Sequence, residues 1–270
     1  MDSTEPTVSK GISYRTKKAL VITGAIVAAL LLAFMVFAIL VTPLRQPYRD
    51  ALAQYNNVIH AGALLGAAGS SLNASGATDE QFNKNIDTAR NFVNSLKTEN
   101  QALGKEAVLT TGEGKTLYDA YNAKLQAFIT YNTNVLAAMQ KVRPVLVTCS
   151  QSMADISEAS KAAVAVRACS DKLNALGGIP DADYTQLVVS FQAEYAKLAT
   201  TLEQLATTDP ADTAMVQDLT QQRTDTLAAI NKASATFSEN VQSTRKTILT
   251  TDTQQKLEDY LKSHSSVVGV

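Results

Sequence analysis

Few residues in this sequence could perform acid–base or metal chemistry. The histidines are His60 and His264, and no HExxH pair or Cys/His cluster accompanies them, so a zinc site lacks ligands. Neither histidine is placed to activate a serine or carboxylate nucleophile, and carboxylate pairs are too common in any chain to single out a site. The GKT tripeptide at 114–116 resembles the end of a phosphate-binding loop, but Leu109 stands where that motif needs glycine. We therefore expect no enzymatic activity, cofactor or metal.

The two cysteines, Cys149 and Cys169, offer clearer chemistry. An even pair in an exported chain indicates a disulfide. One continuous helix would separate them by about 30 Å, whereas a disulfide needs Cα atoms within about 7 Å. We therefore predict that the chain doubles back, with an extended strip at 145–152 lying along a helix that begins near Asp155. The bridge is interpreted as a structural staple, without a metal or redox role.

Four tyrosines form the other candidate site. They lie on heptad seams near the starts of two predicted helices: Tyr118, Tyr121, Tyr184 and Tyr195. Aromatic side chains can line a ligand pocket between the helices of a bundle. Core packing is the favoured interpretation, because seam aromatics are normally core, and the pocket is the alternative. The longest predicted seam has heptad spacing and consists of Tyr118, Tyr121, Leu125, Phe128, Asn132, Val135, Met139 and Val142. Its polar member, Asn132, is interpreted as a core residue that sets helix register.

The helices that must position these groups are predicted from apolar periodicity and from capping and helix-breaking residues. They begin, in chain order, at Tyr48, after a capping box at 78–81, after a connection at 105–114, near Asp155, at Asp181 or Asp183, at Asp209-Pro210 and around Leu257. Gly104 is expected to stop the second helix, and Arg143-Pro144 the third. Gly62-x-x-x-Gly66 is expected to mark a tight helix contact. No segment alternates with period two, so the fold class is all-α, an elongated antiparallel bundle of about six helices.

A membrane anchor is predicted at 19–41. These twenty-three residues carry no charge, and Thr23 is the one polar interruption. A helix of this length spans the roughly 30 Å of a bilayer's hydrocarbon core, and the run exceeds the about 7–15 apolar residues of a signal peptide. A retained anchor is favoured over a cleaved signal. The chain then divides into a cytoplasmic tail (1–18), the transmembrane anchor (19–42), the helical bundle (43–262) and a flexible end (263–270).

Charge indicates the orientation of the chain and excludes some partners. Four Lys or Arg residues precede the apolar run and two, Arg45 and Arg49, follow it closely, which favours a cytoplasmic N-terminus. The bulk is then extracellular or periplasmic, in a bacterial envelope. After the run there are 20 basic and 23 acidic residues, so no nucleic-acid surface and no polybasic lipid clamp is expected.

These observations predict a single-pass membrane protein whose bundle acts by protein–protein contact, as an envelope scaffold, adhesion or assembly component. Its partner is an unidentified protein or a second copy of the chain. The alternative is a ligand-binding or sensory bundle. Because the chain has one predicted span and a short tail before it, such a bundle would signal through a membrane partner.

Overall fold

The computed structural model of the protein describes residues 44–69, 71–72, 78–154, 158–248 and 251–266. Within these ranges the regular structure is helical and no residue forms a strand, which confirms the all-α prediction. No helix among the described residues combines the length and apolar character needed to cross a bilayer. The predicted anchor at 19–41 lies outside the described residues.

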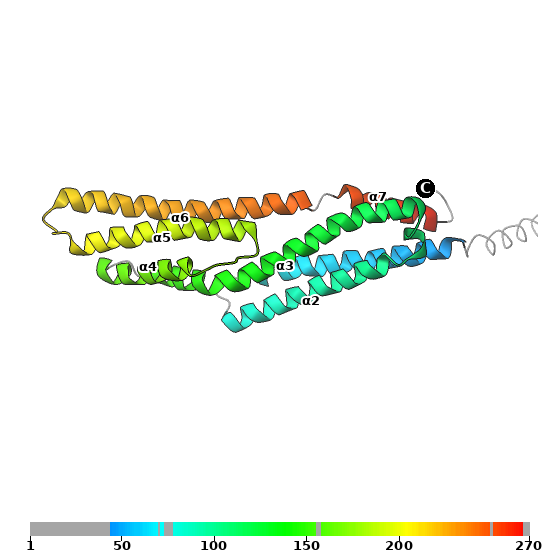
Figure 1. Ribbon diagram of the computed structural model, residues 1–270, viewed down its shortest axis with the longest axis horizontal. Coiled ribbons are helices and arrows are strands. Elements are labelled where there is room, and N and C mark those ends of the chain that lie inside the picture. The colour runs from blue at the N-terminus through cyan, green and yellow to red at the C-terminus, as the bar shows by residue number, and fades with distance from the viewer. Residues whose placement is uncertain (1–43, 70, 73–77, 155–157, 249–250, 267–270) are drawn as a thin grey trace, which may run out of the picture.

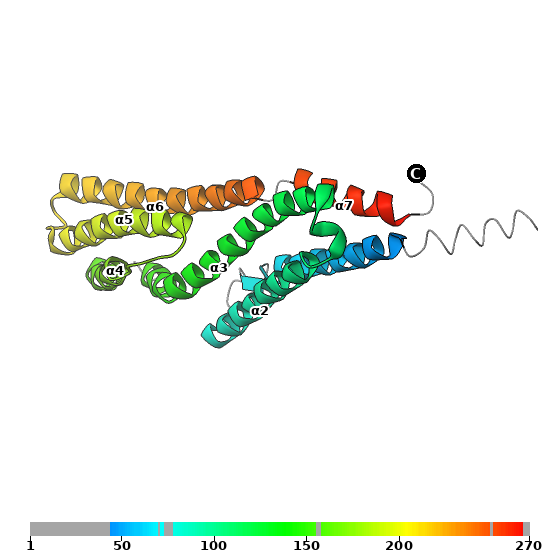
Figure 2. The same ribbon diagram turned by 45° about the vertical axis from the view of Figure 1, so that its right-hand side comes forward.

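The helices pack into an elongated body (Figure 1). After a helix over 44–69, the elements are α2 (Asp79–Leu103), the short 3-10 turn η1 (Ala107–Leu109), α3 (Gly112–Ala154), α4 (Ala159–Asn174), α5 (Ala182–Thr207), α6 (Thr213–Ile248) and α7 (Asp252–Ser265). At one end, α4, α5 and α6 lie side by side; α2, α7 and the helix over 44–69 occupy the other end. Figure 2 shows α3 crossing obliquely from α7 to α4.

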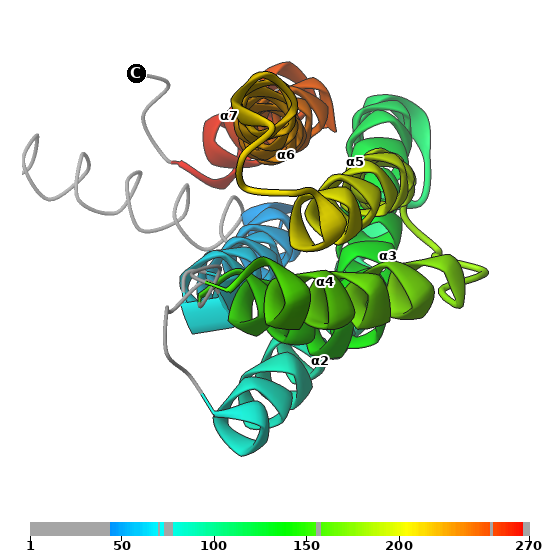
Figure 3. The same cartoon turned by 90° about the vertical axis from the view of Figure 1, so that its left-hand side faces the viewer.

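Two hydrophobic cores share α3. The first core is built by the helix over 44–69, α2, η1, the first part of α3 and α7, and its fully buried side chains include Tyr55, Ile86 and Leu96. The second is built by the end of α3 with α4, α5 and α6, around Val166 and Leu198. Figure 3 looks along the long axis from the end that holds the second core. The two cores therefore follow one another along the molecule, and α3 connects them.

Two helices begin at the capping residues that the sequence predicts. The Thr78 hydroxyl accepts a hydrogen bond from the Gln81 backbone N–H at 3.2 Å, as a capping box requires. Of the two candidate caps for α5, Asp181 is the one used, and its carboxylate accepts from the Tyr184 backbone N–H at 3.0 Å. These contacts satisfy backbone donors that the first turn of a helix leaves unpaired.

The prediction that a helix ends at Arg143-Pro144 is wrong. Helix α3 continues through Pro144 to Ala154, so residues 145–152 are helical and form no extended strip. A proline inside a helix costs about 3 kcal/mol because it lacks an N–H and crowds the preceding turn. Here Val142 and Cys149 flank the proline and are both buried in the second core, and this packing holds the helix together across it.

Candidate functional site: a groove along α3

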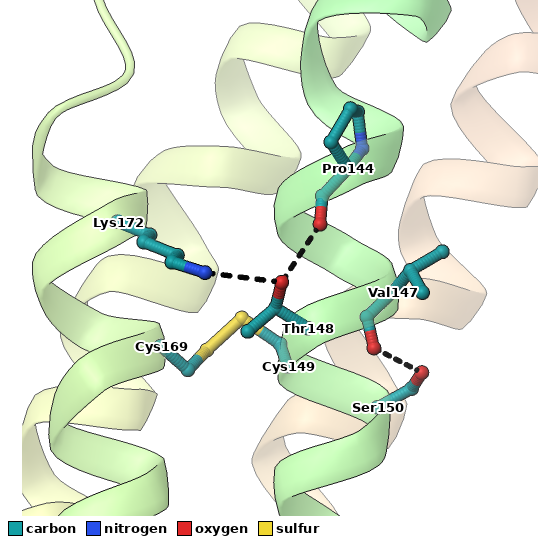
Figure 4. The surroundings of a disulfide bond; sticks show 7 residues. All are labelled: Pro144, Val147, Thr148, Cys149, Ser150, Cys169 and Lys172. Carbon is teal, nitrogen blue, oxygen red and sulfur yellow. Dashed lines mark hydrogen bonds between the residues drawn. A yellow bond between two sulfur atoms is a disulfide. The ribbon is translucent and has the colours of Figure 1, made fainter. Parts of the chain in front are cut away.

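The predicted disulfide is present between Cys149 of α3 and Cys169 of α4, with the two Cα atoms 5.0 Å apart (Figure 4). Both cysteines are buried. The chain doubles back, as predicted, but does so through two packed helices. Beside the bridge, Lys172 donates to the Thr148 hydroxyl at 3.4 Å. The bond therefore ties α4 to the end of α3 inside the second core.

The four seam tyrosines lie in different surroundings. The Tyr118 hydroxyl donates to the Asn100 carbonyl at 3.0 Å inside the first core. Tyr195 packs in the second core, its ring 5.8 Å from that of Phe191. Each of the remaining two borders a cavity, and these cavities are distinct: Tyr121 lines one and Tyr184 the other.

The cavity beside Tyr121, named here the glycine cavity, has a volume of about 490 Å³. It lies between the helix over 44–69, the first part of α3 and the region where α6 gives way to α7. Its walls are largely apolar and include Val58, Ile59, Gly62, Ala63, Gly66, Leu96, Leu125, Phe128 and Ile248. Lys124, Arg245, Thr253 and Gln254 add polar groups to this lining.

Gly62 and Gly66 face open space in this cavity. A Cβ atom built on either glycine would meet no described residue within 4 Å, so the expectation that this spacing marks a tight helix contact is wrong. Helix α6 ends at Ile248 and α7 begins at Asp252 beside these glycines, and neither helix packs a side chain onto them. The two glycines therefore form a smooth stretch of cavity wall.

The second cavity, named the junction cavity, has a volume of about 330 Å³ and lies between the two cores. Tyr184 lines it together with Tyr131, Asn132, Phe237 and Arg245. The Tyr184 and Phe237 rings meet edge to face with centroids 4.8 Å apart. The Tyr131 hydroxyl is buried and has no hydrogen-bond partner within the described part of the chain. Burial raises the pKa of both tyrosines, so both hydroxyls stay protonated and able to donate.

Asn132 is a core residue, as predicted, but its hydrogen bond lies within its own helix and does not set helix register. Its side chain is 7% exposed, and its amide nitrogen donates to the Phe128 carbonyl of its own helix at 2.7 Å. Over the residues that the structure describes, it makes no hydrogen bond to another helix. A polar contact between helices is made instead by the buried Asn100, whose amide donates to the Asn122 side chain at 2.7 Å.

Arg245 of α6 joins the two cavities, because its side chain lines both. Its Nη2 atom lies 3.7 Å from the position that a Cβ would take on Gly69, so it reaches across to the helix over 44–69. No aspartate or glutamate is among the described residues that line either cavity, and the charged ones are Arg245 and Lys124. Both side chains are exposed, and neither forms an ion pair with a described residue. The glycine cavity and the junction cavity together form a groove along α3. This groove combines apolar walls with two cations that form no ion pair with a described residue.

The heptad seam of α3 explains why this groove follows that helix. Its middle members are only partly buried because they line the cavities: Leu125, Phe128, Val135 and Met139. Sequence reasoning identified these residues as core and missed Gly62, Gly66 and Arg245 as lining groups. The available signal was the pair of glycines inside an otherwise regular helix, since glycine weakens a helix interior.

Comparison with protein-family models, curated proteins and solved structures finds no match to this chain. Across the described ranges, no three His, Cys, Asp or Glu side chains are grouped so that they could hold a metal ion. The chemistry of the groove is therefore argued from its own lining.

Proposed function

We propose that this protein is a membrane-anchored, extracytoplasmic helical bundle that binds an apolar ligand in the groove along α3. The observation that carries the proposal is the glycine cavity. Its volume of about 490 Å³ falls within the roughly 300–1,000 Å³ of sites that hold small molecules. Such sites combine apolar walls with a few polar groups that fix orientation, as Lys124 and Arg245 would do here.

The location rests on the sequence and on the disulfide. The apolar run at 19–41 supports a single-pass anchor, and the excess of basic residues before it supports a cytoplasmic N-terminus. A buried disulfide fits an oxidising compartment such as a periplasm or cell surface. A ligand signal would then pass to a membrane partner.

The location has its own test. Membranes that contain the full chain are washed with alkaline carbonate, and intact cells are then treated with a membrane-impermeant amine reagent. We expect the protein to stay in the pellet and lysines after residue 43 to be labelled. Release into the wash, or labelling only after lysis, would contradict this part of the proposal.

Action through protein–protein contact, as an envelope scaffold, adhesion or assembly component, is a second proposal. Its support is that a large apolar side chain is exposed on each of α4, α5 and α6, outside the lining of the two cavities: Val164 at 73%, Val189 at 52% and Met215 at 48%. Exposed apolar groups of this kind are frequent at sites of protein contact when they gather into a patch.

Photo-cross-linking of the full chain in its native membrane separates these two functions. A diazirine analogue of lysine replaces Lys124 at the glycine cavity, and the same analogue replaces Lys161, exposed on α4, as the matched control. We expect a small-molecule mass adduct at position 124 and no small-molecule adduct at 161. A protein adduct at position 161, which lies on the same helix as the exposed Val164, would support the contact function. No adduct at position 124 would contradict ligand binding in the groove.

A further inference from the structure

We infer that the ligand of the groove is an amphiphile with one acyl chain and an anionic head group. The chain lies in the glycine cavity and the head group lies at Arg245, where the two cavities meet. This inference rests on the proposed function and deepens it by naming the chemical class of the ligand.

The lining of the glycine cavity suits an acyl chain. Gly62 and Gly66 offer it a flat wall, with Leu125 and Phe128 of α3 supplying apolar contact.

The charges of the groove favour an anion. The charged side chains that line the two cavities in the described residues are both positive, Lys124 and Arg245, although the whole chain has a net charge of −1. In addition to burial, Asp181 and Asp183 lie close enough to Tyr131 to raise its pKa, against the lowering effect of Arg245, but neither carboxylate lines the cavities. The positive character is therefore confined to the lining itself. An arginine guanidinium can hold a carboxylate or a phosphate through two parallel hydrogen bonds.

Polar groups of the junction cavity are placed to complete the head-group site. The unpartnered Tyr131 hydroxyl is a buried donor on the wall that Arg245 shares. Asn132, which is 93% buried, lines the same wall. The Tyr131 hydroxyl can donate to the second oxygen of a head group, whereas a purely hydrocarbon ligand would leave it unsatisfied.

The test is titration of the full chain in zwitterionic nanodiscs with cis-parinaric acid, a fluorescent fatty acid, with empty nanodiscs as the blank. We expect saturable fluorescence above the blank that palmitic acid displaces. Hexadecanol, which has the same chain without the charge, should displace it at least fivefold less well. Arg245→Gln should weaken binding of the acid about fivefold to tenfold, whereas Lys246→Gln, on the same helix but outside the cavity lining, should change it less than twofold.

A cavity-filling variant and a matched control locate the acyl chain. Gly66→Leu places a side chain in the cavity and should abolish binding. Ala53→Leu, exposed on the same helix and outside the cavity lining, is the control and should bind within about twofold of the unaltered chain. Circular dichroism checks that both remain folded. Equal binding by Gly66→Leu and Ala53→Leu would overturn the position of the chain.

The outcomes also distinguish this inference from the proposed function. Equal displacement by palmitic acid and hexadecanol would overturn the anionic head group. No binding of cis-parinaric acid, together with a small-molecule adduct at position 124, would overturn the acyl amphiphile and leave the ligand function standing. No binding and no adduct would overturn both.

Discussion

The Tyr118 ring packs directly against Gly104. Its Cζ atom lies 2.8 Å from the position that a Cβ would take on Gly104, and its hydroxyl donates to the Asn100 carbonyl. Gly104 has a φ of −66°, an ordinary helical value. It ends α2 as predicted, but the structure requires glycine there because of the tyrosine ring and not because of a left-handed turn.

Gly104→Ala should therefore destabilise the first core. Tyr118 is buried and held by its hydrogen bond, so relieving the clash moves packed atoms and costs about 1–3 kcal/mol. The free energy of unfolding of the full chain, measured by urea titration, checks this. Gly177→Ala is the matched control, because a Cβ there meets nothing within 4 Å, and we expect a change below about 0.5 kcal/mol. A smaller loss for Gly104→Ala than for the control would contradict the packing argument.

Gly62→Ala and Gly66→Ala should each have the opposite effect. Both glycines lie inside a helix, and a Cβ on either enters open space. Replacing an unconstrained helical glycine with alanine stabilises by about 0.5–1 kcal/mol, because the unfolded chain loses conformational freedom. Thermal unfolding of each variant without added ligand measures the gain. A destabilised variant would mean that another group covers these glycines.

The sequence predicts the fold best where one helix's own periodicity decides the outcome. In α2, residues at alternating steps of four and three form one stripe from Phe82 to Leu103, and every residue on it is buried, including Asn100. The sequence predicts the fold less well where packing between distant segments overrides a local signal. Pro144 is a local signal to stop, and burial of Val142 and Cys149 against other helices overrides it.

The groove could be predicted only in part for the same reason. The sequence indicates Tyr121 and Tyr184 as candidates because both lie on heptad seams. Each of them borders a cavity. Arg245 comes from a distant part of the chain, and no spacing rule places it beside Gly69. A seam shows which face of a helix is apolar, but it does not show whether a neighbouring helix covers that face.

Asp181 should make stability depend on pH. Burial raises the pKa of its carboxyl above the ordinary value of about 3.9, and the nearby Asp183 carboxylate adds to this. Between the unfolded and the folded pKa of Asp181, the folded state then binds more protons than the unfolded state. The stabilisation is therefore complete below the unfolded pKa and is lost as the pH rises through the folded pKa.

Asp181→Asn tests this dependence. The amide oxygen can still accept from the Tyr184 N–H, but it carries no charge, so the variant should gain stability relative to the unaltered chain as the pH rises from about 4. Melting temperatures over a pH series provide the measurement. Asp181→Ala also removes the acceptor and should be less stable than Asp181→Asn at every pH. A constant difference between Asp181→Asn and the unaltered chain would contradict the raised pKa.

Loss of the disulfide should weaken the second core selectively. The bridge closes a loop between residues separated by 20 positions, for which restriction of the unfolded chain contributes about 3 kcal/mol. Because α4 is bound to α3 by this bond, amide hydrogen exchange of the Cys149→Ala/Cys169→Ala double variant should speed up in α4 and at the end of α3. Exchange in α2, which packs in the other core, should change little. The reduced, unaltered chain is the control that separates loss of the bond from loss of buried sulfur, and it should show the same pattern. Equal acceleration in α2 and α4 would mean that the two cores unfold as one unit.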